Sequence, residues 1–160
     1  MPFHTADLCD AHPDNLQVFQ PGLHAFGGAK RCEGSVTTLL LDEDNSALVE
    51  LLQREGAGRI AVVDARGDYC AIVGDTLMGY ASQNNWSGII VNGYVRDIEN
   101  TANIPVGLWA LGTCPRKSRK KAAAQYGCDL EFLGVTIHEG DYLYADSDGI
   151  VVSDVKFGEK

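Results

Sequence analysis

The stretch from Gly74 to Asp97 has the pattern of a turn, a helix and a buried strand in immediate succession. Residues 74–77 read as the turn, and residues 78–85 continue as a helix with apolar side chains at spacings of three and four. Residues 88–91 are a short apolar run with β-branched side chains, typical of a strand buried on both faces. Because such strands occur in sheets that helices cover, the pattern predicts an α/β fold.

Three chemically useful groups flank this helix and strand. Arg96 and Asp97 follow the expected strand directly, at the carboxyl end where open α/β sheets usually bind ligands. The turn that begins at Gly74 leads into a helix N-terminus, which attracts anions. An anion-binding turn, a guanidinium and a carboxylate suited to a metal can therefore converge on one pocket.

Each of these side chains also has an ordinary structural interpretation. Asp97 can hold a hard cation such as Mg²⁺, or it can cap the turn that starts at Ile98. Arg96 can clamp a carboxylate or an enolate oxygen, or it can form a surface salt bridge. Asp75 can orient or activate a water near the metal, or it can cap the helix that follows it. The residue pattern leaves these alternatives open.

Length and charge restrict the class of protein. A chain of 160 residues suits one domain, expected here to span residues 1–160, and eighteen glycines imply many tight turns between short elements. The net charge of −9 argues against nucleic-acid binding, which requires a basic face. One basic run is an exception, and it is either a solvated segment or a patch that receives an acidic substrate or partner. Its members are Arg116, Lys117, Arg119, Lys120 and Lys121.

The cysteines and the apolar runs favour a cytoplasmic protein. Five cysteines without a C-x-x-C pair give no zinc-site spacing and no dense disulfide framework, so we expect free thiols in a reducing compartment. No apolar run reaches the roughly 18 residues that span a membrane, and residues 1–10 have no apolar core typical of a signal peptide.

Beyond residues 74–97, helix and strand patterns alternate in the first two-thirds of the chain, and the end is mostly β. The expected helices lie at residues 5–11, 47–55 and 98–102, with Thr5 and the segment 44–46 as N-caps. The expected strands lie at residues 35–41, 60–63, 69–73, 106–111, 131–137, 142–145 and 150–152. Residues 17–28 are expected to be a loop, and turns are expected at residues 65–68, 138–141 and 146–149.

Two groups of polar residues near the end of the chain are interpreted as turns. Asp146 and Asp148, followed by Gly149, resemble part of a calcium loop, but the glutamate at the twelfth position of such a loop is missing. His138 beside Glu139 is also expected to be a turn residue. The G-x-S-x-G motif and the glycine fingerprint for dinucleotides are both absent.

An ordered set of motifs gives the chain a family resemblance over nearly its whole length. It resembles the RraA-like family, named for the regulator of ribonuclease activity A, which includes the class II 4-hydroxy-4-methyl-2-oxoglutarate aldolases. The motifs are T-A-D-L-C-D (5–10), F-G-G (26–28), E-D-N (43–45), G-R-I-A-V-V-D (58–64), Q-N-N-W-S-G-I-I-V-N-G-Y-V-R-D (83–97), P-R-K-S (115–118) and L-Y-A-D-S-D-G-I-V-V-S (143–153).

The resemblance implies a fold and a set of site residues. The fold is a swivelling β/β/α domain like that of phosphohistidine domains, assembled as a homotrimer with sites near subunit boundaries; pairing of trimers into a hexamer stays open. The family's Asp-x20-Arg-Asp motif matches Asp75, Arg96 and Asp97. By this match Asp97 holds a divalent metal, Mg²⁺ or Mn²⁺, and Asp75 and Arg96 are catalytic. Substrate binding falls to Arg96 and to the turn of Gly74, Asp75, Thr76 and Leu77.

The resemblance also implies an activity. The expected reaction is metal-dependent cleavage of 4-hydroxy-4-methyl-2-oxoglutarate to pyruvate, with oxaloacetate decarboxylation through the same pyruvate enolate. The acid after Arg96 favours this enzymatic branch, since ribonuclease-inhibiting members can lack it. The alternative is a protein-binding regulator of ribonuclease E that uses the acidic surface.

The chain departs from the family pattern in two places. Residues 120–125 replace a glycine-rich turn. No residue is assigned to the glutamate that larger aldolases borrow from a neighbouring subunit. Some related sequences carry a methyltransferase label, but this chain has no recognisable nucleotide-cofactor loop.

Overall fold

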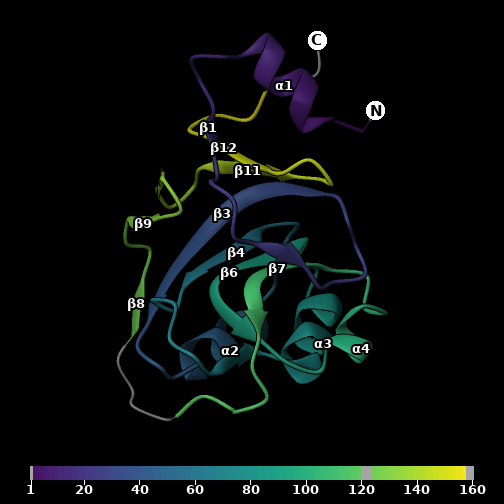
Figure 1. The fold of residues 1–160 in the computed structure, drawn as a ribbon, viewed down its shortest axis with the longest axis vertical. Coiled ribbons are helices and arrows are strands. Elements are labelled where there is room, and N and C mark those ends of the chain that lie inside the picture. Colours follow the sequence, from purple (N-terminus) through teal and green to yellow (C-terminus); the bar gives the residue numbers. More distant parts are fainter. Residues whose placement is uncertain (1, 120–123, 158–160) are drawn as a thin grey trace.

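The computed structural model describes residues 2–119 and 124–157, and its centre is one curled sheet of ten strands (Figure 1). The main path through the sheet is β1-β12-β11-β3-β4-β6-β7-β2, with β5 beside β6 and β8 beside β3. These strands are β1 (Gln17–Val18), β2 (His24–Ala25), β3 (Cys32–Leu41), β4 (Ile60–Asp64), β5 (Ala71–Val73), β6 (Gly88–Val95), β7 (Gly107–Thr113), β8 (Ala124–Tyr126), β11 (Tyr142–Ala145) and β12 (Ile150–Ser153).

The middle of the sheet is parallel, as the buried apolar runs predict. β3, β4, β6 and β7 pair in parallel, with Val62 opposite Thr38 on one side and Ile90 on the other. The first four residues of β4 and of β6 are all buried. This confirms the α/β class, because strands covered on both faces need apolar side chains on both.

Strand β3 joins the two halves of the sheet. Its first four residues pair with β11, whereas residues 36–40 pair with β4. Residues 39–41 also pair with β8 on the side away from β4. One ten-residue strand thus connects the parallel centre to the antiparallel end formed by the C-terminal strands.

Three helices cover one face of the parallel centre: α2 (Ser46–Leu52), α3 (Asp75–Gln83) and α4 (Ile98–Thr101) (Figure 1). Leu48 and Leu52 of α2 and Met78 and Ala81 of α3 are completely buried in the larger apolar cluster. Each large side chain among them contributes about 1.5–3 kcal/mol by leaving water. The packing fixes the N-terminus of α3 at the carboxyl edge of the sheet.

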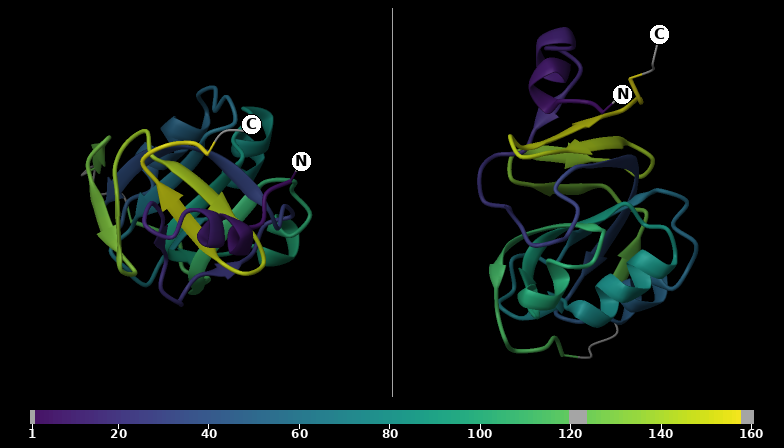
Figure 2. Two further views of the ribbon diagram at one scale, coloured as in Figure 1. Left: turned by 90° about the horizontal axis from the view of Figure 1, so that it is seen from above. Right: turned by 90° about the vertical axis from the view of Figure 1, so that its right-hand side faces the viewer.

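The antiparallel strands and α1 (Thr5–Ala11) lie at the other end of the molecule, where both terminal segments also lie (Figure 2). Asp146, in the turn between β11 and β12, accepts hydrogen bonds from the backbone N–H and the hydroxyl of Thr5 at 2.8 and 2.7 Å. The expected role of Thr5 as a helix cap is therefore wrong, because its hydroxyl bonds to the turn and not to its own helix. The calcium-loop fragment serves instead as the attachment of α1.

A hairpin of β9 (Leu130–Phe132) and β10 (Val135–Ile137) covers the second apolar cluster. It replaces the single strand expected at residues 131–137, because Leu133 and Gly134 both have positive φ and form a tight reversal.

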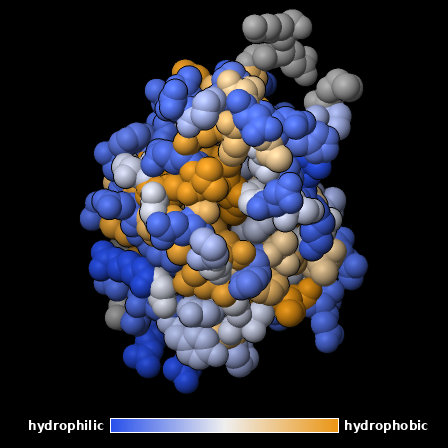
Figure 3. All heavy atoms as spheres, turned by 45° about the horizontal axis from the view of Figure 1, so that its top comes forward, coloured by the Kyte–Doolittle hydropathy of each residue, from blue (hydrophilic) through white to orange (hydrophobic). Residues whose placement is uncertain are grey.

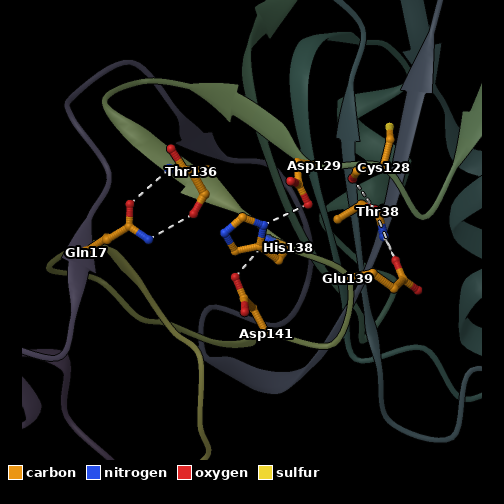
Figure 4. A network of polar contacts seen from close by, with 8 residues as sticks. All are labelled: Gln17, Thr38, Cys128, Asp129, Thr136, His138, Glu139 and Asp141. Atoms are coloured by element: carbon orange, nitrogen blue, oxygen red, sulfur yellow. Dashed lines mark hydrogen bonds and ion pairs between the residues drawn. The ribbon is translucent and has the colours of Figure 1, made fainter.

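Polar contacts fasten this hairpin on two sides, as Figure 4 shows. Gln17 exchanges two hydrogen bonds with the backbone of Thr136. Nδ1 of His138 lies 2.7 Å from Asp129, and Glu139 accepts a hydrogen bond from the backbone N–H of Thr38 at 2.7 Å. The backbone N–H of Asp141 donates to the carbonyl of His138 at 3.0 Å, which confirms the turn expected at residues 138–141.

Three other segments differ from or agree with the sequence pattern in identifiable ways. The loop expected at 17–28 contains β1 and β2, each paired to the main sheet. Asn45 does not cap α2 with its side chain, which donates to the carbonyl of Ile72; Asp44 accepts from the N–H of Ser46 instead. The five cysteines are free thiols, as expected. The predictions for residues 120–123 lie outside the described residues.

Candidate active site

Two segments that are far apart in sequence leave the sheet at the same edge. The ends of β5 and β6 pair through Val73 and Val95, so Gly74 and Arg96 follow neighbouring strand ends. The backbone N–H of Arg96 donates to the carbonyl of Val73 at 2.9 Å. The next segment is held there too, since the N–H of Cys114 donates to the carbonyl of Val95. The predicted placement at a carboxyl edge of the sheet is therefore what the structure has.

Asp97 has a left-handed backbone, with φ of 60°, and this turns its side chain toward α3. Its Oδ2 accepts a hydrogen bond from the backbone N–H of Asp75 at 3.2 Å. A methyl group on Gly74 would lie 2.6 Å from the same oxygen, so glycine makes room for the carboxylate. Asp97 occupies the N-cap position of α4, as the alternative interpretation expects, but its side chain forms no capping hydrogen bond there, so the carboxylate is not used by that helix.

Asp75 is the first residue of α3, and the cap position belongs to Gly74. The carboxylate of Asp75 accepts a hydrogen bond from Nδ2 of Asn100 on α4 at 2.9 Å. Two hydrogen bonds therefore connect these segments. The side chain of Asp97 bonds to the backbone of Asp75, and the side chain of Asp75 bonds to Asn100 of α4. The alternative interpretation of Asp75 as an N-cap is therefore wrong.

Arg96 is half-buried beside these acids. Its guanidinium donates to the carbonyl of Pro115 at 3.4 Å, and no ion pair of Arg96 is found in the part of the chain that the structure describes. This weak contact leaves most of the five N–H groups of the guanidinium available to a ligand.

A cavity of about 660 Å³ brings most of the predicted site residues together. Its lining joins the turn before α3, the end of β6 and the first part of the basic run. The lining residues are Asn45, Ala71, Ile72, Gly74, Thr76, Leu77, Arg96, Asp97, Arg116, Lys117, Ser118 and Arg119. Asp75 contributes its backbone to the turn, but its side chain is directed to Asn100 and is not part of the lining.

The described part of the basic run is held by its backbone. The carbonyl of Arg116 accepts from the N–H of Ala71 at 2.6 Å, and the N–H of Arg119 donates to the carbonyl of Glu43 at 2.8 Å. The side chains of Arg116, Lys117 and Arg119 are exposed on this fixed segment and line the cavity. The described part of the run is thus both exposed to solvent and part of the cavity lining, which is compatible with either interpretation of its charges.

The donor set at this edge fits one kind of metal. Among residues 2–119 and 124–157, no group of three or more histidine, cysteine or acidic side chains could hold a metal ion by itself. Asp97 offers one hard carboxylate whose Oδ2 bonds to the helix, which leaves its other oxygen for a cation. Mg²⁺ keeps several waters and binds through one or two carboxylates together with substrate oxygens, so the residues present fit such an ion.

Asn45, Ser118 and Asn100 are the residues of this region that sequence reasoning missed. Asn45 and Ser118 belong to the family motifs E-D-N and P-R-K-S but were given no role in the site, and nothing in the sequence around Asn100 marks it. They reach it because the ends of β3, β5 and β6 lie together.

Two other hollows differ in chemistry. One of about 650 Å³ is lined by Trp86, Arg31 and Glu33 among others. Another, of about 390 Å³, has Trp109 and Ile150 in its lining. Figure 3 shows apolar side chains gathered in the middle of one face with polar ones around them. Neither hollow is lined by the adjacent arginine and aspartate that the first cavity has.

No helix among the described residues is long and apolar enough to cross a membrane.

Comparison with known families gives a match over most of the chain. The family model RraA-like, described as Aldolase/RraA, matches residues 5–152. Proteins of Burkholderia mallei (strain SAVP1) and Burkholderia pseudomallei (strain K96243), provisionally named 4-hydroxy-4-methyl-2-oxoglutarate aldolase, are each 46% identical over 160 residues. The matches cover 96% of this chain and 97% of each relative.

Solved structures share the fold. A protein of Geobacillus kaustophilus HTA426 described as S-adenosylmethionine: 2-dimethylmenaquinone methyltransferase is 37% identical with a TM-score of 0.94, and 97% of each chain is covered. The RNA-processing inhibitor RraA from Thermus thermophilis is 35% identical, also with a TM-score of 0.94, and the match covers 99% of this chain and 96% of that one. The expected swivelling β/β/α domain is thereby confirmed.

Proposed function

Because this chain belongs to the RraA-like family, we propose that it is a divalent-metal-dependent lyase that cleaves 4-hydroxy-4-methyl-2-oxoglutarate to pyruvate and also decarboxylates oxaloacetate. The observation that carries this proposal is the convergence of Arg96, Asp97 and the turn before α3 on one cavity. The names of the Burkholderia relatives support the aldolase reaction.

Arg96 binds the 2-oxo acid end of the substrate. Its planar fork donates two parallel hydrogen bonds to a carboxylate, or one each to a carboxylate and the neighbouring keto oxygen. The turn of Gly74, Thr76 and Leu77 lines the same cavity, and its backbone N–H groups at the start of α3 favour a negatively charged ligand. These groups hold the pyruvoyl unit in one orientation.

Both reactions require stabilisation of the same negative charge. Cleavage of the bond to the third carbon leaves a pyruvate enolate, whose oxygen carries the developing negative charge. The backbone of Arg96 is fixed at the sheet edge and its side chain lines the cavity, so its guanidinium is close enough to stabilise that charge. A Mg²⁺ or Mn²⁺ ion held by Asp97 would supply Lewis-acid stabilisation of the same charge.

Asp75 is proposed to move protons through an ordered water. Asn100 fixes its carboxylate at 2.9 Å, and this keeps one orientation of the acid beside the turn. A water oriented by Asp75 accepts the substrate hydroxyl proton in the aldol cleavage and returns a proton to the enolate carbon.

Pyruvate release, coupled to a second enzyme, tests the proposal. We expect the purified protein to form pyruvate from both substrates with Mg²⁺ and from neither after the metal is removed. Pyruvate formation that persists in the metal-free protein would exclude the metal. No pyruvate from either substrate under any metal would exclude the lyase.

We also infer a second, protein-binding function, the regulation of ribonuclease E. The 35% identity to an RNA-processing inhibitor and the net charge of −9 support it, since an acidic surface competes with RNA for basic segments. Capture of ribonuclease E that weakens with salt and is unchanged in Arg96→Ala is the expected result. Failure to capture it at low salt would exclude this function.

The assembly and the compartment are proposed together with the function. We propose a homotrimer in the cytoplasm. Light scattering of the purified protein distinguishes a trimer from a hexamer and from a monomer.

A further inference from the structure

Asp75 and Asp97 are neighbours at the site, yet their carboxylates are directed to different partners. The backbone N–H of Asp75 donates to Oδ2 of Asp97 at 3.2 Å, so the two residues meet across the turn. Asp97 lines the cavity, whereas the side chain of Asp75 bonds to Asn100 and is not part of the lining. Magnesium sites in proteins use one or two carboxylates. The structure therefore places a second acid beside the proposed metal ligand but turns it elsewhere.

A rotation of one side chain would turn this second acid toward the first. The nitrogen of Asp75 lies 3.2 Å from Oδ2 of Asp97, and only the Cα and Cβ atoms separate that nitrogen from the carboxyl carbon of Asp75. The staggered χ1 rotamers direct a carboxylate to different sides of the same backbone. Asp75 is half-buried at the start of α3, and side chains with solvent access change rotamer readily. The acid can therefore face either Asn100 or a cation held by Asp97.

Asn100 meets Asp75 from a well-anchored segment. The backbone N–H groups of Asn100 and Thr101 both donate to the carbonyl of Asp97 at 2.9 Å, which closes the single turn of α4. Thr101 is completely buried, and its hydroxyl donates to the carbonyl of Phe26 at 2.8 Å. The backbone that carries Asn100 is thus fixed to the body of the protein. Its amide donates to Oδ2 of Asp75 at 2.9 Å from this fixed position.

We infer that Asn100 is a positioning residue that keeps Asp75 from becoming a second metal ligand and so reserves it for proton transfer. The inference rests on the proposed lyase function, and it assigns this role to a residue outside the Asp-x20-Arg-Asp motif. A carboxylate that coordinates a dication gives up lone pairs to it, and those lone pairs are the ones that orient a water. Metal binding and proton transfer therefore compete for the side chain of Asp75, and the hydrogen bond from Asn100 favours proton transfer.

Loss of the amide should increase metal affinity and decrease turnover at the same time. In the wild type, Asp75 must give up a hydrogen bond to its charged oxygen before it can turn to a cation. Asn100→Ala removes that cost, so we expect Mn²⁺ to bind about tenfold more tightly. Asn100→Leu keeps the shape of the side chain without a donor and should behave in the same way. A residue needed only for folding would not strengthen metal binding when it is removed.

A double-mutant cycle assigns the added affinity to Asp75. Electron paramagnetic resonance measures Mn²⁺ binding, without substrate, to the wild type, Asp75→Ala, Asn100→Ala and the double variant. Asp75→Ala alone should weaken binding by no more than about threefold, the effect of a nearby charge acting through water. In the Asn100→Ala background the same substitution should abolish the whole gain, so the two changes are not additive.

Asn103→Ala is the matched control. Asn103 is also exposed and lies just beyond α4, but its side chain donates to the backbone carbonyl of Glu99 at 3.1 Å. This variant should keep the wild-type Mn²⁺ affinity and activity. Thermal unfolding checks that each variant is folded. Equal affinities of the wild type and Asn100→Ala, or a gain that persists in the double variant, would overturn the inference and leave the lyase proposal intact.

Pyruvate release by the same proteins separates the two proposals. In Asn100→Ala we expect kcat to fall by about tenfold as Asp75 is diverted from its water. KM should stay unchanged, because Arg96 and the turn before α3 are not altered. The expected Mn²⁺ pattern in a protein that releases no pyruvate would reject the proposed reaction and keep the role of Asn100. A wild type that binds no Mn²⁺ would reject both.

Discussion

The carboxylate of Asp97 closes the N-terminus of helix α3 through the backbone N–H of Asp75, 3.2 Å from its Oδ2. A negative charge at this position is stabilised by the partial positive charge of the helix end. The proposed metal ligand is therefore also a structural part of the turn that receives the substrate. A substitution at either residue should therefore change the position of the other.

Replacing Asp97 separates these two roles. Asp97→Ala removes both, and Asp97→Asn keeps an oxygen that can accept from Asp75 but removes the charge that a dication needs. We expect both variants to lose at least about 100-fold in lyase turnover, because several kcal/mol of charge stabilisation are lost. Asp97→Asn should unfold closer to the wild-type temperature than Asp97→Ala does. Steady-state kinetics at saturating Mg²⁺ and calorimetric unfolding measure the two effects.

Gly74 is predicted to be needed for space and not for backbone freedom. Its φ of −131° is open to any residue, but an added methyl group would meet Oδ2 of Asp97 at 2.6 Å. Gly74→Ala should therefore displace that carboxylate and weaken metal binding, measured by titration with Mn²⁺. Gly79→Ala in the same helix is the matched control, since no heavy atom lies within 4 Å of the added group. That control should stabilise the protein by up to about 1 kcal/mol and leave activity unchanged.

Metal removal should be reversible. Asp97 contributes one carboxylate in the proposed site, so the ion should be weakly held and easily extracted by EDTA. Activity should return when Mg²⁺ or Mn²⁺ is added after dialysis. The unfolding temperature should shift little on chelation, because the fold is built from apolar clusters on both faces of the sheet. Loss of folded structure on chelation would instead indicate a structural metal.

The pair of His138 and Asp129 should make the stability depend on pH. The hydrogen bond to Asp129, and its charge, raise the pKa of His138 above its usual value. A raised pKa in the folded state stabilises the protein below about pH 6.5, and this contribution is lost as the pH rises through the folded pKa. Asp129→Asn should therefore lower the unfolding temperature at about pH 5.5 and have a smaller effect at about pH 8.5. An equal effect at both pH values would contradict this account.

Asp146 should contribute to stability through its contacts with α1. Burial by itself raises its pKa, but hydrogen bonds from Thr5 and from the N–H of Asp148, with the charge of Arg31, outweigh burial and leave the pKa below its usual value. Its contribution is thus present above about pH 4 and lost as the pH falls further. Asp146→Asn should cost about 1–3 kcal/mol in urea unfolding at neutral pH. The exposed neighbour Asp148 serves as the control, and Asp148→Asn should have little effect.

Much of the fold followed from local patterns. The strands at residues 60–63, 142–145 and 150–152 were predicted within one residue at each end. They are short apolar runs between strong turn signals. The division of residues 131–137 into two strands was missed, because it depends on Leu133 adopting a positive φ that a non-glycine residue seldom adopts.

For the site, the sequence by itself placed Arg96 and Asp97 at a strand end and the Gly74 turn at a helix start, because periodicity and turn residues are local properties. The tertiary structure alone decided that Asp97 bonds to Asp75, that Asp75 bonds to Asn100, and that part of the basic run from Arg116 to Arg119 lines the same cavity. Those contacts join residues about twenty or more positions apart, and they depend on which strands are neighbours and in what register. Strand order is fixed by the packing of the whole sheet, and a local pattern does not specify it.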